Sequence, residues 1–271
     1  MPFLNANGIR TRYEIEGKGP ALLLVAGNGM DRTCFRDQVP EFAKHFRCIT
    51  YDLRGIGESD VTPAGYGTRE MAADALALLA SLKIERAHIA GYSLGGCIGQ
   101  EMALAEPECV ATLSLYSSLD KMQPYLRRRY EILIKVLMEG TPELWAMYSA
   151  FTAFGEAYIN AHDAEIEQEV KARAARWQGS QPPSKEGLLG HYRALMLHDA
   201  AGRLPAIRCP TWIAVGTSDT VTPPSYSERM QAAIPGAEMK VFEGGPHRLL
   251  NFAIREFNEA ALAFLLRHRA A

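Results

Sequence analysis

The sequence predicts an α/β fold: a mostly parallel, twisted sheet with helices on both faces and an inserted helical cap. Short apolar runs suited to buried strands alternate along the chain with segments of helical periodicity. This alternation is typical of β-α-β units with right-handed crossovers. It is interrupted over residues 119–203, where helical patterns follow one another without a convincing strand. We therefore expect a core domain formed by residues 1–118 and 204–271, with the cap inserted between them.

The expected strands are short and mostly apolar. Residues 9–16 alternate and run into a Gly-Lys-Gly-Pro turn, as an opening antiparallel strand would. The later runs are continuously apolar, which suits strands covered on both faces. These runs are residues 21–26, 48–51, 87–90, 111–116, 211–215 and 239–242.

Helical periodicity separates these strands. Residues 69–82 carry apolar side chains at helical spacing, and Thr68 is suited to cap their N-terminus. In the cap, Thr141 followed by Pro142 is a typical helix start. Further helices of the core are expected at residues 95–105, 226–233 and 254–266, and those of the cap at 125–138, 142–154, 165–177 and 187–198.

Composition excludes several classes of function. Lys and Arg number 29 and Asp and Glu number 31, so the net charge is −2 and nucleic-acid binding has little electrostatic support. The N-terminus lacks the pattern of a secretory signal, and the apolar runs are far shorter than the roughly 20 residues that span a bilayer. We expect a cytoplasmic protein with no membrane or nucleic-acid partner.

The cysteines indicate neither disulfides nor a metal site. There are five of them, widely spaced, and no C-x-x-C pair occurs. An odd number at such spacing is typical of reduced thiols in a cytoplasmic protein. Nucleotide-binding loops and the H-E-x-x-H zinc motif are also missing from the sequence. We expect no metal and no cofactor.

The strongest functional signal is Gly91-Tyr92-Ser93-Leu94-Gly95-Gly96, which follows an apolar strand and opens a helix rich in small residues. The G-x-S-x-G pattern needs its glycines because the chain reverses sharply from strand to helix. Such a turn exposes the serine hydroxyl at the carboxyl edge of the sheet, beside the positive end of a helix. Ser93 is therefore the expected nucleophile.

A serine hydroxyl needs a base, and His247 is the best placed of the seven histidines. It follows a Gly-Gly-Pro turn directly after the strand that ends at Phe242, so its loop can bring the imidazole over Ser93. The other histidines lie on helix, strand or cap patterns. Among them His198, next to Asp199, is the one alternative that we keep open.

The imidazole in turn needs a carboxylate that fixes its tautomer and stabilises its cation. Asp219 is the expected acid, because it lies just past the strand at 211–215. Asp120, after the strand at 111–116, is the competing candidate. For the oxyanion, the residue after the nucleophile supplies one backbone N–H, here Leu94, and the loop after the first long strand supplies the other, for which we choose Asn28.

Taken together, these segments resemble α/β-hydrolase-fold proteins with a helical cap, in particular 3-oxoadipate enol-lactonases, esterases and C–C bond hydrolases. The order serine, aspartate, histidine is the one these enzymes use. One departure is that many relatives carry His-Gly at the oxyanion loop, where this chain has Ala26-Gly27. The matching segments are residues 51–60, 91–96, 216–219 and 245–247.

The cap is the expected source of substrate selectivity. Its aromatic and methionine side chains would form either a hydrophobic pocket or the cap's own core. Trp145 and Phe151 are the substrate contacts that we single out. The run Arg127-Arg128-Arg129 could attract an acidic substrate, although a charge run on a helix is more often a solvated face.

The sequence thus predicts a cofactor-independent serine hydrolase for a small or medium carboxylic ester or lactone. Ser93 would form the acyl-enzyme, with His247 as base and Asp219 as its partner. The same triad also serves C–C bond cleavage of β-diketone-like or ring-fission products, and lyase or perhydrolase chemistry. A ligand-binding receptor that keeps a triad is the alternative of another class. The expected partner is a small molecule, and a homodimer is the base-rate expectation for the assembly.

Overall fold

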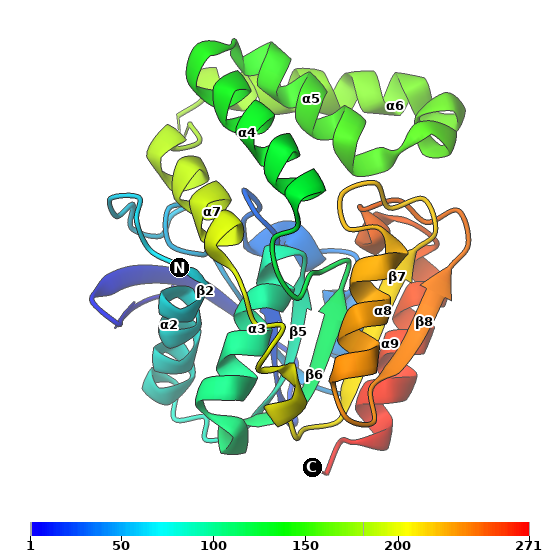
Figure 1. Cartoon of the computed structure of the whole chain (residues 1–271). Coiled ribbons are helices and arrows are strands. Elements are labelled where there is room, and N and C mark those ends of the chain that lie inside the picture. The colour runs from blue at the N-terminus through cyan, green and yellow to red at the C-terminus, as the bar shows by residue number, and fades with distance from the viewer. Residues whose placement is uncertain (1, 181, 271) are drawn as a thin grey trace.

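The computed structural model describes residues 2–180 and 182–270. Within these ranges, strands in the order β1-β2-β4-β3-β5-β6-β7-β8 form an eight-stranded sheet at the centre of the molecule (Figure 1). The strands are β1 (Phe3–Ala6), β2 (Ile9–Glu16), β3 (Ala21–Val25), β4 (Arg47–Tyr51), β5 (Ala87–Tyr92), β6 (Val110–Tyr116), β7 (Thr211–Gly216) and β8 (Glu238–Phe242).

The sheet is antiparallel at one end and parallel elsewhere. Strand β2 pairs antiparallel with both β1 and β4, whereas every later pair, from β4–β3 to β7–β8, is parallel. The mostly parallel sheet is therefore confirmed. Strands β5, β6 and β7 are buried along their whole length, which explains their continuous apolar sequences. The parallel strands end at one common edge, and the loops at that edge can converge.

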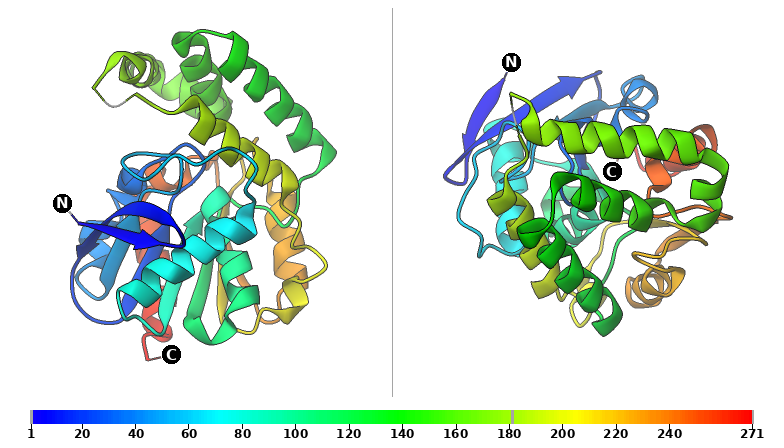
Figure 2. Two further views of the ribbon diagram at one scale, coloured as in Figure 1. Left: turned by 90° about the vertical axis from the view of Figure 1, so that its left-hand side faces the viewer. Right: turned by 90° about the horizontal axis from the view of Figure 1, so that it is seen from above.

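Helices cover both faces of the sheet, as predicted (Figure 2). Alternation along β3 divides the core, since Leu23 packs on one face and Leu22 on the other. The Leu23 face is covered by α2 (Thr68–Ser81), α3 (Leu94–Ala105) and α8 (Pro224–Ala233), and the Leu22 face by α1 (Val39–Phe42) and α9 (Ile254–Arg267).

Between β6 and β7 the chain forms the predicted helical cap, which lies over the carboxyl edge of the sheet (Figures 1 and 2). Its helices are α4 (Pro124–Glu139), α5 (Pro142–Phe154), α6 (Glu156–Ala175) and α7 (Lys185–Leu197). Short 3-10 turns complete the described chain at Arg32–Phe35, Pro107–Cys109, Arg176–Gln178, Leu204–Ala206 and Leu249–Asn251. Among the helices of residues 2–180 and 182–270, none is long and apolar enough to cross a membrane.

The helix starts bear out one capping prediction and contradict another. Thr141 caps α5, because its hydroxyl accepts a hydrogen bond of 3.2 Å from the amide of Leu144. Thr68 does not cap α2 but is its first residue, after Gly67. The Thr68 hydroxyl is instead hydrogen-bonded to Nδ1 of His198, at 3.0 Å. This tertiary contact takes the oxygen that the sequence pattern assigned to the cap.

Candidate active site

Ser93 lies in the sharp turn between β5 and α3, with φ 52° and ψ −113°. A positive φ is uncommon for a residue with a side chain and marks a turn that its surroundings hold in place. The amide of Ser93 donates to the carbonyl of Tyr116 at 2.8 Å, and the hydroxyl of Ser118 donates to the Ser93 carbonyl at 2.9 Å. The end of strand β6 and the loop that follows it therefore fix this turn from both sides.

The glycines around Ser93 are required by close backbone approach. A Cβ on Gly91 would lie 2.2 Å from the carbonyl oxygen of Gly95, and a Cβ on Gly95 would lie 2.0 Å from that of Val25. On Gly96 it would lie 2.4 Å from Oγ of Ser118. Strand β5, helix α3 and strand β3 can meet this closely only without side chains, which gives the G-x-S-x-G-G sequence its physical basis.

His247 lies in the loop after β8, and its Nε2 is 3.2 Å from Oγ of Ser93. The main chain of the histidine is also held, since its carbonyl accepts a hydrogen bond of 3.0 Å from the Tyr92 hydroxyl. Sequence reasoning did not assign this role to Tyr92, which is the residue before the nucleophile. The loop is thus tied to the same turn that presents the serine.

Asp219 faces the other nitrogen of the imidazole. Its Oδ2 and Oδ1 lie 2.9 Å and 3.1 Å from Nδ1 of His247. The carboxylate also accepts hydrogen bonds from the amides of Val221 and Thr222, at 2.9 Å and 2.8 Å, and from the Thr222 hydroxyl at 2.9 Å. The Asp219 carboxylate accepts a hydrogen bond from Nδ1–H of His247, so Nε2 is left to accept the hydroxyl proton of Ser93.

The structure places the two alternative residues elsewhere. Asp120 forms a two-pronged ion pair with Arg229, at 2.7 Å and 3.0 Å, and makes no bond to His247. His198 is buried against Thr68, with Nδ1 3.8 Å from a carboxylate oxygen of Glu101. Burial lowers the pKa of His198 to about 4. Both residues serve the packing around the cap exit.

The two backbone amides that the sequence assigns to the oxyanion follow Ser93 and strand β3. Leu94 N–H is at the start of α3, and Asn28 N–H is in the loop after β3. Within the described residues neither amide donates to a protein acceptor. The Asn28 loop is closed by a hydrogen bond of 3.2 Å from the Met30 amide to the Gly27 carbonyl. Gly27 lies against the Tyr92 ring, where a Cβ would come within 2.7 Å of a ring carbon.

The cap reaches this loop through two residues that the sequence did not single out. Nδ2 of Asn28 donates to the hydroxyl of Tyr130 on α4, at 3.2 Å. The amide of Gly29 donates to Nδ1 of His191 on α7, also at 3.2 Å. These partners are more than 100 residues away along the chain. Only the docking of the cap could reveal them.

The two cap residues named as substrate contacts have different surroundings. Trp145 donates from its indole to the Tyr192 hydroxyl at 2.9 Å and packs against Trp177, so it belongs to the interior of the cap. Phe151 is 70% exposed. No aromatic contact or hydrogen bond in the described part of the chain joins Phe151 to the triad. Within the described residues, no hydrogen bond or aromatic contact links Trp145 or Phe151 to Ser93 or His247.

The three consecutive arginines do not converge on the site. Arg127 donates to the carbonyl of Met196, and Arg128 pairs with Glu131 on the same helix. Arg129 donates to the Thr220 carbonyl at 2.9 Å, next to Asp219, and thereby fastens α4 to the core. Their contacts are structural or solvated ones.

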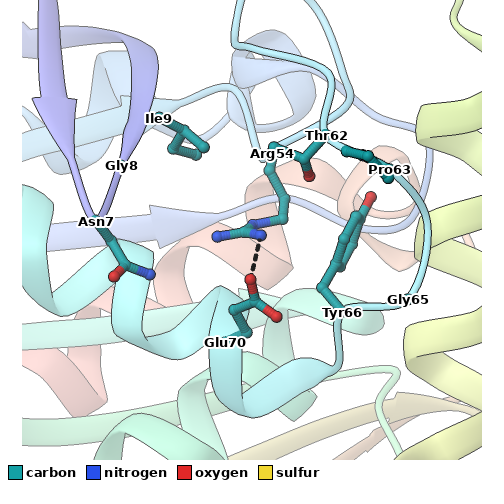
Figure 3. Close-up of a pocket in the computed structure, with 9 residues that line it drawn as sticks. All are labelled: Asn7, Gly8, Ile9, Arg54, Thr62, Pro63, Gly65, Tyr66 and Glu70. Carbon is teal, nitrogen blue, oxygen red and sulfur yellow. Dashed lines mark hydrogen bonds and ion pairs between the residues drawn. The ribbon is translucent and has the colours of Figure 1, made fainter.

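A cleft of about 350 Å³ lies on another part of the molecule (Figure 3). It is lined by Arg54, Tyr66, Glu70 and the turn at Asn7–Gly8, and it contains no member of the triad. The charge of Arg54 is already balanced there by Glu70 at 2.7 Å and by Asp74 at 2.6 Å. Across residues 2–180 and 182–270, no group of three or more His, Cys, Asp and Glu side chains could hold a metal ion.

Comparison with known proteins identifies the family of this chain. A family model described as the alpha/beta hydrolase fold matches residues 20–250. A relative from Azorhizobium caulinodans, a candidate carbamate hydrolase called RutD, is 30% identical over 264 residues, which cover 97% of this chain and 98% of the relative.

Solved structures agree on the fold. A thermophilic esterase from Thermogutta terrifontis, in a malate-bound form, has a TM-score of 0.85 and 27% identity, covering 99% of this chain and 98% of that one. The enol-lactonase from Burkholderia xenovorans LB400 has a TM-score of 0.86 and 24% identity, covering 98% and 100%. With a family model that spans most of its length, the chain belongs to the alpha/beta hydrolase fold family.

Proposed function

We propose that this chain is a cofactor-independent serine hydrolase that cleaves a small or medium carboxylic ester or lactone. The observation that carries the proposal is the continuous line from Asp219 through His247 to Ser93, with Nε2 of the imidazole 3.2 Å from the hydroxyl oxygen. Two amides support it further: that of Leu94, the residue after Ser93, and that of Asn28, in the loop after β3, the strand that pairs with β5. Nucleophile, base, orienting acid and oxyanion donors are the parts that acyl transfer requires.

The reaction would begin when the Ser93 oxygen attacks the substrate carbonyl and His247 takes the hydroxyl proton on Nε2. Negative charge then develops on the carbonyl oxygen, where the two amides and the positive end of α3 stabilise it. Collapse of this intermediate breaks the ester bond, and His247 returns the proton to the leaving alkoxide. The product of this half is an acyl-enzyme on Ser93.

Water completes the cycle. His247 removes a proton from water, the hydroxide attacks the acyl carbonyl, and the proton passes to the Ser93 oxygen as the acid departs. Throughout, Asp219 holds Nδ1 and stabilises the imidazolium cation. Its own three hydrogen bonds, from Val221 and Thr222, keep the carboxylate in place.

The alternatives differ in the bond cleaved or in the absence of chemistry. A C–C hydrolase, lyase or perhydrolase would use the same triad on another substrate. The relative from A. caulinodans is named as a carbamate hydrolase, and a carbamate is a further carboxyl derivative that the same steps could cleave. A receptor would bind a ligand without turnover.

The test combines a fluorophosphonate probe with a substrate panel of aryl esters, lactones, carbamates and β-diketones. The probe should label Ser93, and Ser93→Ala should abolish both labelling and ester or lactone turnover while the chain stays folded. Ser81→Ala, at an exposed serine on α2, is the matched control and should leave both unchanged. Full ester turnover by Ser93→Ala would refute the mechanism. Turnover of diketones alone would favour the C–C hydrolase, and ligand binding without labelling would favour the receptor.

A further inference from the structure

Helix α6 lies over the two loops that carry the expected oxyanion donor and the catalytic imidazole. Just after its C-terminal end, Arg176 pairs with Asp31 at 3.2 Å, in the loop that follows Asn28. In its middle, Glu169 lies 4.0 Å from Arg248, the residue after His247. Figure 2 (right) shows α6 from above, between the N-terminal and C-terminal parts of the core.

Arg173 projects from the inner side of this helix. Ile166, Val170 and Arg173 occupy positions i, i+4 and i+7 and so share one face of α6. Ile166 and Val170 on this face pack with side chains of α5. The Arg173 side chain is only 20% exposed, whereas Lys171, two positions away on α6, is 71% exposed. A guanidinium on an inward face needs a specific partner, because burial penalises its charge.

The partners within the protein do not balance the positive charge. Nε and Nη2 of Arg173 both donate to Oε1 of Glu169, at 2.9 Å for Nε. Arg248 lies 4.0 Å from that same oxygen. Two guanidiniums thus share one carboxylate oxygen, and Nη1 of Arg173 has no hydrogen-bond partner within the described residues.

The surroundings of Arg248 supply little further compensation. Its Nε donates to the neutral side chain of Asn251 at 3.0 Å, and its guanidinium lies over the Phe154 ring at 5.6 Å. Its Nη1 is 3.9 Å from the sulfur of Met30. Burial lowers the pKa of Arg173, and the charge of Arg248 lowers it further. A second anion between the two arginines would offset this repulsion.

Arg248 and the methionine that it contacts also adjoin the expected reacting groups along the chain. Arg248 directly follows His247, and Met30 lies two residues after Asn28. We propose that Arg173 and Arg248 bind a carboxylate of the substrate, so that the preferred ester or lactone carries this anion close to its scissile carbonyl. This inference rests on the proposed function and names its substrate class. Planar guanidiniums suit the role because their paired N–H groups match the geometry of a carboxylate.

The test compares two small esters that differ in charge, methyl butyrate and monomethyl succinate. The wild-type protein should have the higher kcat/KM for monomethyl succinate. Arg173→Gln and Arg248→Gln should each lower that value about 10- to 100-fold while changing kcat/KM for methyl butyrate less than about threefold. Arg173→Lys should recover part of the loss. Lys171→Gln, on the exposed side of α6, is the matched control and should leave kcat/KM for both esters unchanged.

Glu169→Gln separates an anion site from a structural ion pair. It removes the one carboxylate shared by both arginines, so an anion site should gain positive charge and show a lower KM for monomethyl succinate. If the ion pair is purely structural, Glu169→Gln and Arg173→Gln should instead lower kcat/KM for both esters by the same factor. That pattern, or an unchanged ester preference in both arginine variants, would overturn the proposal.

Binding provides a readout that does not depend on turnover. Succinate should bind to the Ser93→Ala variant more tightly than the neutral succinamide does, as measured by calorimetry. Adding Arg173→Gln should remove this difference, and persistence of the difference would contradict the proposal. Should Ser93→Ala keep its esterase activity while succinate binding still depends on Arg173, the catalytic mechanism would fall but the anion site would stand.

Discussion

His191 on α7 accepts a hydrogen bond of 3.2 Å at Nδ1 from the amide of Gly29, the residue after Asn28. Its Nε2 lies 2.8 Å from the carbonyl of Arg54, to which it donates. Burial lowers the pKa of His191 to about 4, so the ring is neutral near pH 7 and carries its proton on Nε2. The cap therefore holds the loop that carries Asn28 through one tautomer of a buried imidazole.

Replacing this imidazole should weaken catalysis more than substrate binding. In His191→Phe the Gly29 amide loses its acceptor, and the position of the neighbouring Asn28 amide is no longer fixed by this hydrogen bond. We expect kcat to fall about tenfold with a smaller change in KM, because an oxyanion donor acts mainly on the transition state. His191→Asn, which offers an amide oxygen, should recover part of kcat. Steady-state kinetics with an aryl ester would measure this, and an unchanged kcat in His191→Phe would contradict it.

Acid should destabilise the fold through three buried imidazoles. Burial lowers the pKa of His88, His191 and His198 to about 4 each, against 6.5 for a free imidazole. Between these values the unfolded chain binds more protons than the native one. Stability is therefore fully present above pH 6.5 and is lost as the pH falls toward 4, by up to about 1.4 kcal/mol per pH unit for each imidazole.

Urea denaturation between pH 4.5 and 7 would test this pH dependence. The unfolding free energy of the wild-type protein should rise with pH across this window. His88→Gln removes one of the three titrating rings and should reduce the slope by about a third. A slope that is the same in His88→Gln and in the wild type would show that other groups, such as carboxylates, dominate acid unfolding.

Local sequence was sufficient for the sheet and for the turn around Ser93. Continuous apolar runs identify strands that are buried on both faces, and the glycines near Ser93 reflect backbone contacts closer than any side chain allows. The same logic predicted a loop that brings His247 to Ser93, and the structure places them 3.2 Å apart. These features depend on short segments whose pattern has one dominant physical cause.

Features that depend on how the cap docks could not be predicted in this way. Phe151 was singled out from the sequence as a substrate contact, yet its side chain is 70% exposed and no hydrogen bond joins it to the triad. The conspicuous run of arginines at 127–129 makes structural or solvated contacts, while the isolated Arg173 and Arg248 both lie near Glu169 where the cap meets the core. Helical periodicity gives the inward side of a helix. It does not say which loop that side will meet.

The backbone contacts at the turn predict a sharp difference between two glycines. Gly95→Ala would place a Cβ 2.0 Å from the carbonyl oxygen of Val25, and rigid backbone cannot give way as a flexible side chain can. We expect a loss of stability above about 3 kcal/mol or no folded protein at all. Gly67→Ala has open space around the new methyl group and a negative φ, so its unfolding free energy should stay within about 1 kcal/mol of the wild type. Circular dichroism and urea denaturation would compare them.

Two aspartates near the cap offer a final contrast, because one faces the imidazole and the other faces an arginine. Asp219→Asn should keep the fold but favour the wrong tautomer of His247, and kcat/KM should fall by about 10⁴. Asp120→Asn weakens the pair with Arg229, whose side chain is 38% exposed, and should cost only about 1 kcal/mol of stability with kcat/KM nearly unchanged. Kinetics and urea denaturation on both variants would decide the matter. If Asp120→Asn lost as much activity as Asp219→Asn, the acid of the triad would have to be reassigned.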